Sequence, residues 1–231
     1  ALLFAMAAGG ELVLSLERMR KISPVNKAGR SVTCEAGAIT AQIQQAAVEE
    51  GLTYPVDFAS SGSSQIGGNI ATNAGGIQVI RYGMTRDWVT GLKVVTGTGE
   101  LLELNHGLIK NNTGLDFRHL FIGSEGILGV IVEATLALTD PPTNPRVMVL
   151  GIQSMPALME VLAKCQARLS VLAFEFFSDL ALEKVTAAHS ILPPFQERFP
   201  YYALVEFESI STAAETQALE LVEACMAAGW V

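Results

Sequence analysis

The sequence lacks any cluster of basic side chains. Its 15 Lys and Arg residues are outnumbered by 23 Asp and Glu residues, so the net charge is -8 at pH 7. Proteins that bind nucleic acid or an anionic membrane surface need a basic patch. The composition therefore argues against a nucleic-acid partner and against attachment to an acidic membrane surface.

Cysteine is scarce, and its spacing excludes two kinds of site. Cys34, Cys165 and Cys225 are an odd number of residues, far apart, and form no Cys-x-x-Cys or Cys/His ligand pattern. A redox pair or a structural zinc site needs such a pattern. We therefore expect structural thiols in a reducing compartment.

No apolar run is long enough to cross a membrane. Residues 1–8 are apolar, but a span needs roughly 20 residues. They also lack the basic leader and the cleavage site of a signal peptide. We expect a cytoplasmic protein without a membrane span.

The sequence does contain enough apolar material for a sizeable core. Half of it is hydrophobic, and 231 residues allow one large or two small domains. Three prolines within residues 140–145 can neither continue a strand nor begin an ordinary helix. We predict an α+β fold with a first domain of residues 1–141 and a second of residues 142–231.

Strand signals dominate the first domain. Gly97-Thr98-Gly99 lies between two apolar runs, which is typical of an antiparallel hairpin. Residues 129–139 alternate, and we expect one face of this strand to carry Val130, Val132, Ala134, Leu136 and Leu138. The predicted strands are residues 12–16, 31–35, 92–96, 101–104 and 129–139.

One helix is predicted in the first domain. Ile39, Ile43 and Ala47 recur at helical spacing, with Thr40 near the start and Gly51 as the C-terminal stop. This spacing indicates a helix that packs its apolar face on the sheet.

The second domain alternates strands with helices. Its last helix is expected to begin with a capping box of Thr212 and Glu215 and to pack through Leu219, Val222 and Met226. The order is typical of a ferredoxin-like plan that lacks its last strand, which would begin at residue 230. The predicted strands are residues 147–152, 171–177 and 201–208, and the helices are near residues 156–168, 180–189 and 212–226.

The most informative segment is residues 67–76, Gly-Gly-Asn-Ile-Ala-Thr-Asn-Ala-Gly-Gly. This composition offers almost nothing to a core. Glycine admits positive φ and the close approach of another group, and successive N–H groups form concavities for acceptor-rich ligands. The segment predicts a ligand-binding backbone, with a mobile surface loop as the alternative.

Three separated motifs occur here in an order that resembles one family. They are Tyr-Pro-Val-Asp at 54–57 with the serines of 60–64, the glycine-asparagine segment with Arg-Tyr-Gly at 81–83, and Phe-Ile-Gly-Ser-Glu-Gly at 121–126. They resemble the FAD-linked oxidase family. That family has the vanillyl-alcohol oxidase fold and includes glycolate oxidase FAD subunits, D-lactate dehydrogenases and D-2-hydroxyglutarate dehydrogenases.

The resemblance implies a fold and a cofactor site. The first domain would be the second half of a vanillyl-alcohol-oxidase-type FAD-binding domain, a mostly antiparallel sheet with flanking helices. The second would be a truncated C-terminal domain with a partial ferredoxin-like plan. The residues implied to contact FAD are Pro55, Asp57, Gly62, Ser63, Ser64, Gly67, Gly68, Asn69, Thr72, Asn73, Gly75, Gly76, Tyr82, Gly83, Glu125, Gly126, Gly129, Val130 and Ile131.

Several of these residues have alternative interpretations from the sequence. The serines of 60–64 could form a flexible loop, Tyr82 could be a half-buried aromatic residue with a wet hydroxyl, and Glu125 could be the first-turn acid of a short helix. The glycines, Gly75 and Gly76 above all, are expected to leave room for a flat ring.

The sequence departs from the family pattern at two positions. The family usually has Tyr where this sequence has Leu115, and Thr where it has Ile127. The second change removes a hydroxyl near the cofactor. Residues 110–114, Lys-Asn-Asn-Thr-Gly, resemble the D-2-hydroxyglutarate branch more than the glycolate branch.

Two family features are expected outside the sequence. The half-domain with the pyrophosphate loop should precede it, and only Gly9-Gly10 resembles the segment that comes after that loop. The metal-binding and catalytic histidine motif should come after the last residue. The residues of this sequence alone are therefore expected to bind FAD weakly or not at all.

No catalytic residue or metal ligand is identified in the sequence. The resemblance allows a divalent metal in the intact protein, but His106, His119 and His189 are scattered. Solvated or core histidines are expected rather than ligands.

The resemblance implies an FAD-dependent dehydrogenase or oxidase. It would oxidise a D-2-hydroxy acid of the glycolate, D-lactate or D-2-hydroxyglutarate type by hydride transfer to flavin N5, with FAD held non-covalently. Its partners would be the 2-hydroxy acid and an electron acceptor, and a homo-oligomer is compatible with it. The alternative is a non-catalytic α+β interaction module or a relative that has lost its flavin.

Overall fold

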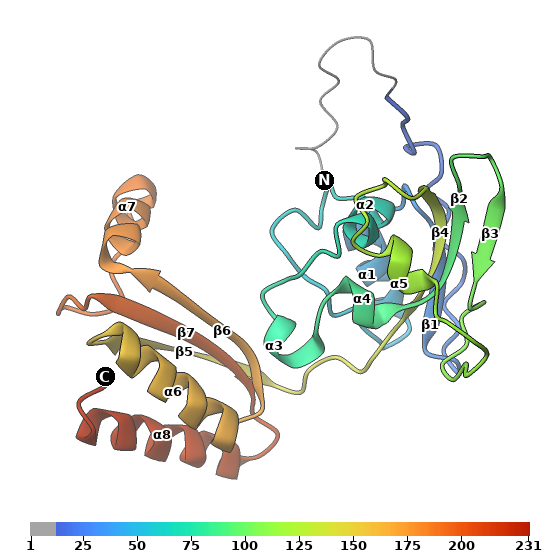
Figure 1. Ribbon diagram of the computed structural model, residues 1–231. Helices are drawn as coiled ribbons and strands as arrows, with labels where there is room; N and C mark the ends of the chain where they lie inside the picture. The colour runs from blue at the N-terminus through green and yellow to red at the C-terminus, as the bar shows by residue number, and fades with distance from the viewer. Residues whose placement is uncertain (1–12) are drawn as a thin grey trace. The chain divides into compact units, whose positions relative to one another are not determined.

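The computed structural model describes residues 13–231, in two compact units (Figure 1). The first unit holds the described residues up to Gly76 together with Tyr82–Pro141, and the second holds Ile77–Arg81 and Pro142–Val231. The expected residues Gly9 and Gly10 and the first residue of the predicted strand 12–16 lie outside the described part.

The first unit contains a four-stranded antiparallel sheet. Its order is β1-β4-β2-β3, and the strands are β1 (Ser31–Glu35), β4 (Val130–Ala137), β2 (Val89–Val95) and β3 (Leu101–Leu104). Gly99 has a φ of 83° in the turn between β2 and β3, a conformation that favours glycine. The predicted hairpin is confirmed.

The predicted strand at residues 12–16 is wrong for the residues that the structure describes. Val13 and Leu14 lie in irregular chain and are more than half exposed. Isolated bridges instead join Ile22 to Cys34 and Asn26 to Ser31, beside β1. The weak alternation therefore did not correspond to a strand.

A β-bulge changes which side chains of β4 are buried. Lys93 of β2 lies opposite Glu133, but Val94 lies opposite Ile131, so the register shifts by one residue at Val132. A bulge inserts an unpaired residue and reverses the alternation of faces. Ile131 is 5% exposed, whereas Val130 and Val132 are half-buried. The predicted face was wrong for these two valines and right for Ala134, Leu136 and Leu138.

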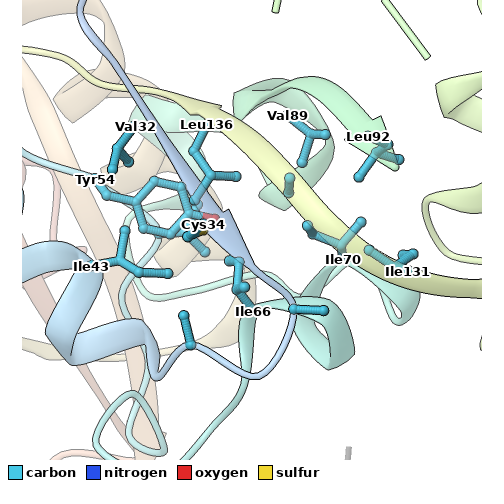
Figure 2. Packing of buried hydrophobic residues seen from close by; sticks show 14 of the residues in the cluster. Val32, Cys34, Ile43, Tyr54, Ile66, Ile70, Val89, Leu92, Ile131 and Leu136 are labelled. Atoms are coloured by element: carbon cyan, nitrogen blue, oxygen red, sulfur yellow. The ribbon is translucent and has the colours of Figure 1, made fainter. Parts of the chain in front are cut away.

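Helix α1 (Thr40–Glu49) packs against β1, and the short helix α2 (Ile66–Ala71) packs against β4. Gly51 comes just after α1 with a φ of 76°, which confirms the predicted stop. Figure 2 shows the core between these elements, where Ile43, Ile66 and Leu136 are fully buried. Two further short helices of this unit are α4 (Thr85–Trp88) and α5 (Arg118–Phe121), while α3 (Val79–Tyr82) belongs to the second unit except for its last residue.

The second unit has a three-stranded antiparallel sheet in the order β5-β7-β6. Its strands are β5 (Pro145–Ile152), β7 (Tyr201–Glu208) and β6 (Val171–Ser178), and its helices are α6 (Met155–Arg168), α7 (Asp179–His189) and α8 (Thr212–Ala227). Helices α6 and α8 lie side by side on the sheet (Figure 1). Every predicted element of this region is confirmed.

The capping box predicted for α8 is wrong. Ser211 is the N-cap residue, Thr212 is the first helical residue, and no side chain caps the helix. The Glu215 carboxylate instead accepts hydrogen bonds from Arg146 Nε at 3.0 Å and from Ser209 Oγ at 3.2 Å. The carboxylate therefore serves tertiary structure rather than the helix end.

The predicted buried face of α8 is right for Val222, which is half-buried and packs against the core, but wrong for Leu219 and Met226. Leu221 and Cys225 are each 1% exposed, whereas Leu219 is 67% and Met226 is 59% exposed. Apolar residues occur on both faces of this helix, so their helical spacing did not decide which face packs.

The three cysteines are buried free thiols. Burial raises the pKa of the Cys34 thiol to about 12, and the Glu133 carboxylate adds to the shift. Burial also raises the pKa of Cys165 to about 12 and raises that of Cys225. Protonated, buried thiols are unreactive, which confirms their structural role. No helix within residues 13–231 is long and apolar enough to span a bilayer.

Candidate functional site

The glycine-asparagine segment is partly helical and contributes to the core. Residues up to Ala71 belong to α2, where Ile70 is fully buried and Asn69 is 4% exposed. The expectation that this segment has almost nothing to offer a core was wrong, because its apolar residue packs under the sheet (Figure 2). Only the part after Ala71 forms an irregular turn.

Two glycines of this segment are required by the protein itself. A Cβ on Gly67 would lie 2.6 Å from the Ala36 Cβ, and a Cβ on Gly76 would meet the carbonyl oxygen of Asp57 at an impossible separation. Both positions allow the close approach of another backbone. The space beside Gly76 is therefore filled by the chain, which corrects the expectation that this glycine is needed to leave room for a ring.

A buried polar network connects α2 to the serine loop of residues 60–64. Asn69 Nδ2 donates to Thr40 Oγ1 at 2.6 Å, and Thr40 Oγ1 lies 2.9 Å from Ser64 Oγ. Thr40 is fully buried at the start of α1, and its N–H donates to Ser64 O at 3.1 Å. Asn69 and Ser64 thus fix the loop, and Thr40 is a residue that sequence reasoning used only as a helix start.

Residues 121–126 form a second wall beside the turn that comes after α2. Gly123 N–H donates to Ile70 O at 3.0 Å and Glu125 N–H donates to Ala71 O at 2.8 Å. These two bonds join segments about fifty residues apart, which the sequence alone could not pair. We call residues 71–76 the first wall and residues 121–126 the second wall.

Left-handed backbone conformations gather in the two walls. Asn73 has a φ of 48° and Glu125 has a φ of 54°, while Gly123 and Gly126 have φ values of 83° and 82°. A residue other than glycine at positive φ costs roughly 1–2 kcal/mol, so its surroundings must hold it. The backbone of Glu125 is thus in a turn rather than in the first turn of a helix.

The implied cofactor residues all lie in the first unit but differ in exposure. The exposed ones are Asp57, Gly62, Ser63, Thr72, Glu125 and Gly126. The half-buried ones are Ser64, Gly68, Asn73, Gly75, Gly76, Tyr82, Gly83, Gly129 and Val130. The buried ones, which protein packing already surrounds, are Pro55, Gly67, Asn69 and Ile131.

Exposed apolar side chains border the walls. Ile127 is 84% exposed, Leu128 is 47% and Met84 is 37% exposed. A flat ring with polar edges needs apolar contact on its faces and backbone or hydroxyl donors at its rim. The walls and these side chains supply both, so the residues fit a flavin.

Tyr82 and the motif around it hold the chain next to the first wall. The Trp88 indole N–H donates to Tyr82 O at 2.7 Å, and the two rings meet edge to face with centroids 6.2 Å apart. Gly83 has a φ of 72° and packs against the Asp87 carboxylate, which accepts a hydrogen bond from Met84 N–H at 2.8 Å. Tyr82 is half-buried, which is compatible with both of its interpretations, so its contact with the cofactor stays a prediction.

The described residues contain no group of three or more His, Cys, Asp or Glu side chains that could hold a metal ion. His119 contacts Arg86, and His106 lies 3.5 Å from a Glu103 carboxylate oxygen.

The α+β fold and the two backbone walls have the features that a flavin-binding domain needs. Two family models cover most of the chain: one described as "FAD binding domain" matches residues 2–105, and one described as "FAD linked oxidases, C-terminal domain" matches residues 141–231. The chain belongs to the FAD-linked oxidase family.

Curated relatives include several named D-2-hydroxyglutarate dehydrogenase and one from Schizosaccharomyces pombe named putative D-lactate dehydrogenase, which is 31% identical over 209 residues that cover 90% of this chain and 40% of the relative. A D-2-hydroxyglutarate dehydrogenase from Xanthomonas citri pv. viticola is 58% identical over 227 residues, which cover 98% of this chain and 48% of the relative. A mitochondrial D-2-hydroxyglutarate dehydrogenase from Bos taurus is 36% identical over 198 residues, which cover 85% of this chain and 36% of the relative. This chain thus spans about half the length of the bacterial relative and 36% of the length of the bovine one.

Solved structures agree on the fold. An alkyldihydroxyacetonephosphate synthase superimposes with a TM-score of 0.70 at 19% identity, over 91% of this chain and 43% of the other. At this identity the likeness shows the fold alone.

Proposed function

We propose that the protein containing this chain is an FAD-dependent dehydrogenase that oxidises a D-2-hydroxy acid, with D-2-hydroxyglutarate as the first candidate. The observation that carries the proposal is the combination of the two backbone walls with 58% identity to a relative of that name. The resemblance of residues 110–114 to the same branch supports the choice of substrate.

In this proposal the exposed residues of the walls contact the flavin. The backbone of Gly126 offers hydrogen bonds, the Thr72 hydroxyl, which donates to Gly68 O at 3.0 Å, can accept one, and Ile127 and Leu128 offer apolar contact. Bound FAD supplies the acceptor for the hydride that leaves the substrate C2. This chain's own contribution is to hold and orient the ring and to exclude water from one side. The base that takes the hydroxyl proton and a divalent metal are proposed to come from residues outside this chain.

The divalent metal has its own test. Treating the full-length protein with a chelator and then restoring a divalent cation would lower and recover activity if the metal takes part. Activity that is insensitive to chelation would contradict this element of the proposal.

We also propose a cytoplasmic location, which the three buried free thiols support.

The experiment is to purify the full-length protein and to measure its flavin and its substrates. We expect a yellow protein that releases FAD on acid precipitation, because no Cys or His occurs in residues 67–76 to form a covalent bond. Reduction of an artificial electron acceptor should be fastest with D-2-hydroxyglutarate and slower with D-lactate or glycolate. It should be absent with L-2-hydroxyglutarate.

Two results would contradict the proposal. A flavin that stays with the precipitated protein would disprove non-covalent binding. A protein without flavin, and without activity on any of the three acids after incubation with FAD, would favour the non-catalytic α+β module.

A further inference from the structure

We propose that Arg86 is the positioning residue that braces the two walls of the flavin site, an inference that rests on the proposed function. Arg86 lies in α4, outside the three motifs that point to the cofactor. The backbone of Arg86 hydrogen-bonds the first wall, and its side chain hydrogen-bonds the second wall. Within residues 13–231, none of the implied flavin residues joins one wall through its backbone and the other through its side chain.

The backbone of Arg86 holds the first wall. Its N–H donates to Asn73 Oδ1 at 2.9 Å, which fixes a side chain whose own backbone is left-handed. The preceding residue strengthens the same contact, because Thr85 N–H and Thr85 Oγ1 both donate to Ala74 O, at 3.0 and 2.7 Å. The start of α4 is thereby joined to residues 73 and 74.

The side chain of Arg86 holds the second wall. Nη2 donates to Ile122 O at 2.5 Å and Nη1 donates to His119 O at 3.1 Å. Nη1 also lies 3.0 Å from His119 Nδ1, and because a guanidinium only donates, this ring nitrogen accepts. The planar group thus spans the end of α5 and the start of the second wall.

No carboxylate among residues 13–231 lies within ion-pair distance of Arg86, so its donors are spent on backbone oxygens and one histidine. Arg118 offers a contrast in the same unit. Its side chain pairs with Asp116 and donates to Val89 O at 2.6 Å, and only its backbone oxygen meets a wall, where it accepts a hydrogen bond from Ile122 N–H at 3.1 Å. Arg118→Ala is therefore the matched control, because it removes a guanidinium that does not join the walls and leaves the backbone bond to Ile122 in place.

The test compares Arg86→Lys, Arg86→Gln and Arg118→Ala in the full-length protein. A lysine ammonium is a point charge and cannot reproduce the fork that spans two carbonyls. We expect both Arg86 variants to raise the Kd for FAD about tenfold and to change the visible circular dichroism of the bound flavin. Arg118→Ala should lower the melting temperature but leave the Kd within about twofold of the wild type.

Hydrogen exchange provides a readout that does not depend on flavin. In Arg86→Lys the amides of Gly123 and Glu125 should exchange faster, whereas those of β2 should not change. If either Arg86→Lys or Arg86→Gln fails to fold, the other variant still tests the proposal.

The outcomes separate the two proposals. A wild type that takes up no FAD contradicts the proposed function, while exchange at Gly123 and Glu125 still tests the brace. A wild type that binds FAD, with folded Arg86 variants of equal Kd and unchanged exchange, overturns the brace alone. An equal loss of FAD affinity in Arg118→Ala would also overturn it, because the effect would then be general destabilisation.

Discussion

The two units reach stable structure by different means. Helices α6 and α8 of the second unit have 14 and 16 residues, and each contributes buried apolar side chains to the core that they share with the sheet. In the first unit α2, α4 and α5 have six, four and four residues, and hydrogen bonds between loops hold them in place. The candidate site lies in the first unit, where loop backbones approach each other closely. The shape of the site therefore depends more on individual hydrogen bonds and missing Cβ atoms than on the volume of buried side chains.

The strongest expected effect concerns Gly76. Replacing it with valine forces a side chain into the backbone of Asp57, so we expect the free energy of unfolding to fall by about 3 kcal/mol or more. Chemical denaturation of the full-length protein measures this, with Gly62→Val as the control because its Cβ meets open space. Equal stability of the two variants would contradict the account of this glycine.

Helix α8 tests the second unit in the same way. Leu221→Ala removes a side chain that is 1% exposed and should cost about 2–3 kcal/mol of unfolding free energy. Leu219→Ala removes one that is 67% exposed and should cost less than about 0.5 kcal/mol. A larger loss of unfolding free energy in Leu219→Ala than in Leu221→Ala would show that Leu219 lies on the packed face, as helical spacing predicted.

The network around Thr40 tests whether polar contacts decide the first unit. Thr40→Val keeps the shape but leaves Asn69 Nδ2 without its 2.6 Å acceptor, so we expect a loss of about 1–2 kcal/mol. Thr40→Ser keeps the hydroxyl and should lose less. Thermal unfolding of both variants makes the comparison, and an unchanged Thr40→Val protein would show that the network is not needed.

The smallest effect concerns Asp116. A hydrogen bond from the Arg118 guanidinium lowers the pKa of this carboxyl below its usual 3.8. A lowered pKa in the folded state contributes stability above about pH 4, and that stability is lost as the pH falls through the folded pKa. The pair is partly exposed, so it contributes less than about 1 kcal/mol.

The measurement is the difference in unfolding free energy between wild type and Asp116→Asn as a function of pH. The difference should be present at pH 6 and shrink below about pH 4. A difference that grows on acidification would have the wrong sign for this pair.

The contrast between the units also explains what could be predicted. Alternating and helical spacing located β6, α6 and β7 closely, because regular elements repeat their pattern. The β4 bulge, the wall formed by residues 121–126 and the bonds of Arg86 come from single contacts between distant residues. Motif resemblance selected the segments of the candidate site, whose contact with a flavin stays a prediction, but it did not reveal that Gly67, Gly76 and Asn69 serve the protein's own packing.

The contact between Gly76 and Asp57 affects how genome surveys use this motif. A glycine that a neighbouring backbone demands would persist in any descendant that keeps the fold, whether or not that descendant still carries a flavin. Exposed positions such as Gly62, where an added Cβ would meet open space, are free of that demand and can drift once the cofactor is gone. Comparing the rates of change at these two kinds of position would separate working flavoenzymes from relatives that have kept only the scaffold.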